Sequence, residues 1–115
     1  MPVKVSIVED LDEVREGLAD LVRSDKELLL LDNFEDAESA AEKLPSLQPD
    51  IVIMDINLPG MSGIDCIKKI KEKCPATQFM MFTVYENDEK VLQALQAGAT
   101  GYLLKRTNPE RILES

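Results

Sequence analysis

The sequence predicts an α/β fold, a single domain in which the strands of a parallel sheet alternate with helices. Two observations carry this prediction. Short apolar runs recur through the 115 residues, and each is followed by a stretch in which apolar residues have helical spacing. Strands that alternate with helices in this way form parallel sheets joined by right-handed crossovers. A chain of this length can build one hydrophobic core, so residues 1–115 are expected to form one domain.

Each of the five expected units begins with a strand and continues into a helix. The predicted strands are residues 3–8, 27–33, 51–55, 78–82 and 101–104. The predicted helices are residues 11–22, 36–44, 62–73, 86–97 and 109–115. Asp10 and Asp36 are suited to cap the first two helices. Pro45 with Pro49, and Pro75, are expected to end the second and third helices, because proline lacks an N–H group.

Composition and charge exclude several functions. Apolar residues make up 44% of the chain, and no apolar run approaches the roughly 20 residues of a membrane span. The start of the chain shows no signal-peptide pattern, so a cytoplasmic location is expected. The net charge of −9 disfavours direct nucleic-acid binding, which requires a basic face, and it favours the binding of a partner or a cation.

The cysteines and the missing histidine narrow the chemistry further. Cys66 and Cys74 would lie about 12 Å apart along a helix, too far for a disulfide, so both are expected to be reduced structural thiols. The chain contains no histidine, which excludes histidine catalysis and a histidine-rich metal site within it. Oxygen ligands remain, and these suit Mg²⁺, Mn²⁺ or Ca²⁺.

The ends of four predicted strands carry residues that suit phosphate chemistry. Glu9 and Asp10 follow the first strand, and the third, fourth and fifth strands end at Asp55, Thr83 and Lys105. In a parallel sheet these ends share one edge, and a 2-1-3-4-5 strand order would open a crevice beside Asp10 and Asp55. Three close carboxylates repel one another unless one is protonated or a cation such as Mg²⁺ binds. With a lysine and a hydroxyl for the phosphate oxygens, the set predicts phosphoryl transfer to a carboxylate.

Each of these residues also has a purely structural interpretation. Asp55 could be a cap or turn residue, and Glu9 with Asp10 could cap the first helix. Thr83 could simply end a strand, and Lys105 could be an ordinary surface lysine. Taken singly these interpretations are reasonable, but the coincidence at four strand ends favours the chemical one.

The chain resembles, over nearly its whole length, the receiver domain of bacterial two-component response regulators. The resemblance is carried by Val8-Glu9-Asp10, residues 54–63 (MDINLPGMSG), Phe82-Thr83 and residues 98–105 (GATGYLLK). The last stretch is typical of the subfamily whose output is a helix-turn-helix DNA-binding domain. The resemblance implies a flavodoxin-like (βα)5 three-layer sandwich with strand order 2-1-3-4-5, here with a short last helix.

The resemblance also implies how the phosphoryl group is accepted. Asp55 would receive it from a phosphohistidine on a sensor histidine kinase, which agrees with the absence of histidine in this chain. Asp10, Asp55 and the backbone carbonyl of Asn57 would bind Mg²⁺, or alternatively Mn²⁺. Glu9 would contribute to the metal site through water.

A switch follows from the same resemblance. Thr83 and Lys105 would contact the phosphoryl group, and Tyr102 would change orientation with Thr83. The face formed by the fourth helix, the fifth strand and the fifth helix would then alter its preference for the effector domain or a dimer partner. The domain would catalyse only its own phosphorylation and dephosphorylation, would not be a metabolic enzyme, and would bind neither nucleic acid nor membrane directly.

Two other functions remain open at this point. One is a pseudo-receiver that binds partners regardless of phosphorylation, and the other is a Mg²⁺-dependent phosphatase with an aspartyl nucleophile. Asn57 disfavours the phosphatase, because such enzymes commonly carry a second acid two residues after the nucleophile. The last helix, residues 109–115, would have only about two turns. This indicates a fragment of a longer regulator without its effector domain, and the apolar surface left exposed would favour dimers.

Overall fold

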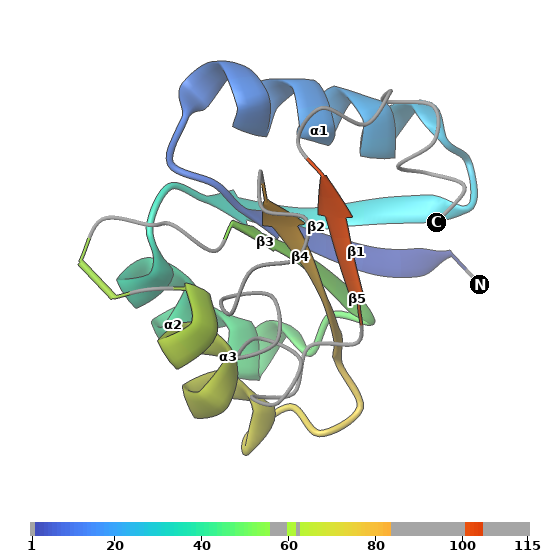
Figure 1. Cartoon of the computed structure of the whole chain (residues 1–115). Coiled ribbons are helices and arrows are strands. Elements are labelled where there is room, and N and C mark those ends of the chain that lie inside the picture. Colours follow the sequence, from blue (N-terminus) through green and yellow to red (C-terminus); the bar gives the residue numbers. More distant parts are fainter. Residues whose placement is uncertain (1, 56–59, 62, 84–100, 105–115) are drawn as a thin grey trace.

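The structure is a parallel sheet with helices on both faces (Figure 1). This computed structural model describes residues 2–55, 60–61, 63–83 and 101–104. The strands are β1 (Val3–Val8), β2 (Leu28–Phe34), β3 (Ile51–Asp55), β4 (Gln78–Thr83) and β5 (Gly101–Leu104). The helices in the described part are α1 (Asp12–Ser24), α2 (Ala37–Leu47) and α3 (Gly63–Lys71). The strand order β2-β1-β3-β4-β5 confirms the predicted order.

Helices cover the two faces of the sheet and enclose separate apolar cores. Successive strand side chains point to opposite faces. Val5 and Ile7 of β1 accordingly pack with Leu18 and Val22 of α1, whereas Val8 packs with residues of α2 and α3. Figure 1 shows α1 on one side of the sheet and the other two helices on the opposite side. None of the described helices is long and apolar enough to cross a membrane.

The start of α1 corrects one prediction. The helix is preceded by Leu11 in an extended conformation, with no side-chain cap, so Asp10 does not cap it. The first turn is closed instead by the Arg15 N–H, which donates to the Leu11 carbonyl at 2.8 Å. Asp12 and Glu13 lie in this turn, where negative charge is favoured by the helix dipole. Asp10 therefore stays outside the helix, at the edge of the sheet.

The end of α2 corrects a second prediction. Pro45 was expected to stop the helix near Leu44, but the helix continues through Pro45 to Leu47. The last turn is closed by Gln48, which adopts the left-handed conformation at φ 49°. Its N–H donates to the carbonyl of the fully buried Leu44 at 3.0 Å, and its side-chain amide donates to the Pro45 carbonyl at 2.6 Å. Packing of the helix thus outweighs the intrinsic effect of proline.

The other helix limits agree more closely with the prediction. Asp36 caps α2, as expected, by accepting the Ser39 N–H at 2.6 Å, and this bond lowers the pKa of the Asp36 carboxyl. The third helix ends at Lys71, two residues before the predicted limit, so Cys74 lies beyond it. Ser62, where the third helix was predicted to begin, and the helices predicted for residues 86–97 and 109–115 lie outside the described residues.

Both cysteines are free and buried, which confirms their structural assignment. The Cys66 thiol lies 3.6 Å from the Ala37 carbonyl, and the Cys74 thiol lies 3.8 Å from the Leu44 carbonyl, so each joins the α3 side of the core to α2. Burial, followed by the negative charge of Glu38, raises the pKa of the Cys66 thiol to about 12. The Cys66 thiol is therefore protonated and unreactive in the folded protein.

The edge strand β2 contains an irregularity. Val5 of β1 pairs with Leu30, but the next residue, Ser6, pairs with Asp32. Leu31 is thus one extra residue on β2, a bulge that locally bends the strand and increases its twist.

Gly63, the first residue of α3, lies directly against the end of β3. A Cβ atom built on Gly63 would overlap the backbone carbonyl oxygen of Asp55. The residue is buried, and its neighbours on that side are the backbone of Asp55 and the side chain of Met54. Only glycine therefore allows α3 to approach the strand this closely.

Replacing Gly63 with alanine is expected to lower the free energy of unfolding by about 1–3 kcal/mol, because the backbone of Asp55 or of α3 has to move. Gly17→Ala in α1 is the matched control: its new Cβ would meet no atom within 4 Å, and alanine favours a helix by about 0.5–1 kcal/mol. Urea unfolding of both variants measures the difference. Equal stability of the two variants would contradict the close approach.

The thiol-reactive dye DTNB is expected to label neither cysteine of the native protein at neutral pH and both in urea. The rate should rise at least about a hundredfold on unfolding, because only the exposed thiolate reacts. Absorbance of the released thiolate follows the reaction. Rapid labelling of one thiol without denaturant would show that Cys66 or Cys74 is accessible and would contradict the burial described here.

Candidate functional site

Parallel pairing of two strands brings the acidic residues together. β1 and β3 are neighbours, and Val8 is aligned with Met54. Glu9 and Asp55 are the next residues along these two strands, and Asp10 follows Glu9. One carboxylate oxygen from each of the three residues lies within 4.8 Å of the other two. The structure therefore confirms that these side chains meet at the carboxyl edge of the sheet.

The acidic cluster is largely buried, which distinguishes it from ordinary charges on the surface. Glu9 is 1% exposed and Asp55 is 3% exposed, while Asp10 is half-buried. Carboxylates are costly to bury close together, and a bound cation lowers that cost. Oxygen ligands are those that Mg²⁺ prefers, and Mg²⁺ takes one or two carboxylates while retaining water. The donor set and its spacing thus fit a divalent cation such as Mg²⁺.

Arg15 contacts the loop that carries Glu9 and Asp10. Its Nη1 donates to the Glu9 carbonyl at 2.9 Å, and its Nη2 donates to the Asp12 carboxylate at 2.5 Å. The Leu11 N–H donates to the Glu9 carboxylate at 3.4 Å. Sequence reasoning missed Arg15, although an arginine one turn into a helix that follows an acidic loop is a usable signal.

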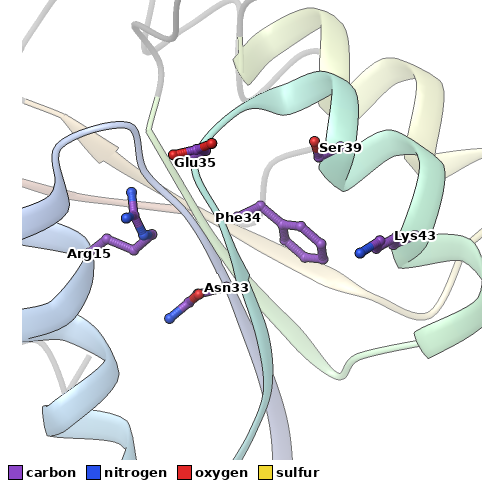
Figure 2. Close-up of a pocket in the computed structure, with 6 residues that line it drawn as sticks. All are labelled: Arg15, Asn33, Phe34, Glu35, Ser39 and Lys43. Atoms are coloured by element: carbon purple, nitrogen blue, oxygen red, sulfur yellow. The ribbon is translucent and has the colours of Figure 1, made fainter.

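A polar pocket of about 270 Å³ opens beside Arg15 (Figure 2). Figure 2 shows Arg15 extending from α1 toward the end of β2, with Ser39 and Lys43 on the α2 side. The pocket is lined by Arg15, Asn33, Phe34, Glu35, Ser39 and Lys43. The arginine thus lies between the pocket and the acidic loop, with the pocket on the side away from β3.

The segment after Asp55 is held from α2 and α3. Gly60 has φ +74°, a conformation that glycine adopts without strain. The Met61 N–H donates to the Glu38 carboxylate of α2 at 3.5 Å, a long bond. Gly63 packs against the Asp55 backbone, as described above. Glu38 and Gly63 were not singled out from the sequence, because neither contact follows from local spacing.

Of the other predicted site residues, Thr83 and Tyr102 lie in the described part of the chain. Thr83 ends β4, one residue beyond Phe82, which is aligned with Asp55 on β3. On β5, Leu104 is aligned with Thr83, and Tyr102 is aligned with Met81. The backbone thus brings the end of β4 beside the Asp55 strand, as expected. Asn57 and Lys105 lie outside the described residues.

Known proteins match this chain in sequence over nearly its whole length. The family described as the response regulator receiver domain matches residues 5–115. The transcriptional regulatory protein LnrK of Bacillus subtilis is 36% identical over 113 residues, and the nitrate/nitrite response regulator protein NarL of Escherichia coli is 32% identical over 114 residues. These matches cover 98% and 99% of this chain but 51% and 53% of the relatives. The chain thus spans about half the length of these curated relatives.

Solved structures show the same architecture. A two-component response regulator of the LuxR family from Aurantimonas sp. SI85-9A1 has a TM-score of 0.91 and 30% identity, covering 99% of this chain and 81% of that one. The response regulator domain of CheB from Thermotoga maritima has a TM-score of 0.91 and 26% identity, covering 99% and 92%. The match to the family spans nearly the whole sequence, and the relatives above are transcription and response regulators. This chain belongs to the response regulator receiver domain family.

Proposed function

We propose that this chain is the receiver of a longer transcription regulator and accepts a phosphoryl group on Asp55 from a sensor histidine kinase. The observation that carries the proposal is the buried Asp55 carboxylate, which lies within 4.8 Å of those of Glu9 and Asp10 at the edge of a parallel sheet. Ligands of open α/β sheets bind at this edge. The names of the relatives, which are transcriptional and response regulators, support a signalling role.

In the proposed reaction, Asp55 is the nucleophile. One carboxylate oxygen attacks the phosphorus atom of the kinase phosphohistidine, the P–N bond breaks, and its electron pair remains on the imidazole nitrogen, which takes a proton from solvent. An acyl phosphate on Asp55 results. The approach of a charged phosphoryl group to three carboxylates is unfavourable without added positive charge.

Charge neutralisation divides between a metal and the chain itself. Asp10, Asp55 and the Asn57 carbonyl would hold Mg²⁺ or Mn²⁺, with Glu9 acting through water. The bound ion would neutralise charge on the phosphoryl oxygens. Lys105 would supply an ammonium group; it directly follows Leu104, which is aligned with Thr83 in the sheet.

The proposed output is a change of surface. Thr83 would hydrogen-bond the phosphoryl group, and Tyr102 on the adjacent strand would reorient with it. The face formed by the fourth helix, β5 and the fifth helix would then change its affinity for the effector domain or a second copy. The chain would catalyse only its own phosphorylation and dephosphorylation, in the cytoplasm. Neither the pseudo-receiver nor the phosphatase is supported by the regulators that this chain is similar to.

Incubation with acetyl phosphate and Mg²⁺ is expected to add the mass of one phosphoryl group to the protein, because the small donor can replace the kinase. Asp55→Asn should abolish the addition, since an amide is not nucleophilic. Asp20→Asn, on the exposed part of α1, should leave it intact. Intact mass spectrometry provides the readout. A phosphorylated Asp55→Asn protein would refute the assignment of the acceptor.

Asp10→Asn is expected to weaken Mg²⁺ binding by about tenfold or more, because one of the close carboxylates is lost. Glu13→Gln, an exposed change of equal charge in the first turn of α1, should alter the affinity less than about twofold. Isothermal titration calorimetry measures both dissociation constants. Similar effects of the two variants would mean that overall charge, and not direct coordination by Asp10, sets the affinity.

A further inference from the structure

The Arg15 side chain makes two hydrogen bonds near the acidic cluster, and neither is to a carboxylate of the cluster. Its planar guanidinium donates one N–H to the Glu9 carbonyl at 2.9 Å and another to Asp12 at 2.5 Å. The side chain is only 12% exposed, although its partner carboxylate is 82% exposed. A guanidinium that donates from both terminal nitrogens has a fixed orientation, which the single ammonium group of a lysine cannot reproduce.

The loop that Arg15 contacts is also held by the sheet, where the Glu9 N–H donates to the Phe34 carbonyl at 3.0 Å. The Glu9 carbonyl belongs to the peptide that links Glu9 to Asp10, so its position sets the direction of both side chains. Leu11 follows without a side-chain cap, and its N–H reaches the Glu9 carboxylate only at 3.4 Å. Arg15 thus adds a side-chain hydrogen bond of 2.9 Å to the backbone of this loop, beyond the bond from the sheet.

We propose that Arg15 is a positioning residue for the metal site: it fixes the Glu9–Asp10 peptide and thereby holds the two carboxylates where a divalent cation binds. This inference rests on the proposed function, because it assumes that the acidic cluster binds Mg²⁺. Partners that orient metal ligands in other proteins change metal affinity by roughly 10–100-fold when they are removed.

Electrostatics alone predicts that removing Arg15 changes the Mg²⁺ affinity in the opposite direction. Arg15 is a cation close to a cation site, so its charge repels Mg²⁺, and removing it should tighten binding. Positioning predicts that removal weakens binding despite this relief. The sign of the change therefore separates the two effects, and Arg15→Lys isolates the geometry because it keeps the charge while losing the planar fork.

Steric disturbance does not complicate the substitution. The pocket of about 270 Å³ lies against Arg15, and Figure 2 shows the Arg15 side chain among those that line it. A shorter glutamine or lysine can occupy this space without meeting new neighbours. The change in metal affinity then reports the lost hydrogen bonds rather than a rearranged core.

The test is Mg²⁺ titration of the whole chain by calorimetry, comparing wild type with Arg15→Gln and Arg15→Lys. Arg23→Gln is the matched control: it lies on the same helix in the same i,i+3 pairing with an aspartate, but it is 56% exposed and about 12 Å farther along the axis. We expect dissociation constants raised about tenfold for Arg15→Gln and about threefold or more for Arg15→Lys. Arg23→Gln should stay within about twofold.

Two further readouts exclude a merely structural role. Urea midpoints measured in EDTA should not follow the order of the Mg²⁺ affinities. With acetyl phosphate, the Mg²⁺ concentration for half-maximal phosphorylation should rise in Arg15→Gln, while the rate at saturating Mg²⁺ should change less than about twofold.

Binding of Mg²⁺ to Arg15→Gln as tight as to wild type, or tighter, would overturn the inference, as would the absence of Mg²⁺ binding by wild type. If wild type binds Mg²⁺ but is not phosphorylated, the proposed function fails. The calorimetric comparison still decides the role of Arg15 in that case.

Discussion

The parallel pairing of β1 with β3 is the constraint on which the site depends. Because Val8 is aligned with Met54, the next residues on both strands emerge at the same level of the sheet. Two carboxylates, from Glu9 and Asp55, are thus placed side by side by backbone hydrogen bonds that do not involve either side chain. A shift of one strand by one residue would turn that strand over and direct its acid to the opposite face of the sheet.

The backbone beside the two acids is contacted in different ways. The guanidinium of Arg15 donates a directional hydrogen bond to the Glu9 carbonyl. Gly63 of α3 packs directly against the backbone of Asp55, because it has no side chain. One side of the site therefore depends on a charged group and the other on the absence of a side chain. Both contacts are made to backbone atoms and not to the carboxylates.

Strand–helix alternation and residues at strand ends could be predicted from the sequence, because periodicity and strand direction suffice for both. The meeting of Glu9, Asp10 and Asp55 was predicted in this way, whereas the strand order followed from the resemblance to the receiver family. The continuation of α2 through Pro45 could not be predicted from the sequence, since it depends on the burial of Leu44 and on the left-handed Gln48. Asp10 was wrongly given a capping role because a local preference does not reveal that the turn ends at Leu11. The contacts of Arg15 and Gly63 are tertiary, so spacing alone did not indicate them.

The bulge in β2 has a consequence for how this protein meets other chains. β2 is the outer strand of the sheet next to β1, and its Leu29 side chain is 46% exposed. An edge of this kind is a template for a foreign strand. The extra Leu31 interrupts the ladder, so the strand offers only three aligned residues on either side of the break. Bulges in edge strands disfavour the addition of a foreign strand, so the extra Leu31 counteracts the exposure of the apolar Leu29 on this edge.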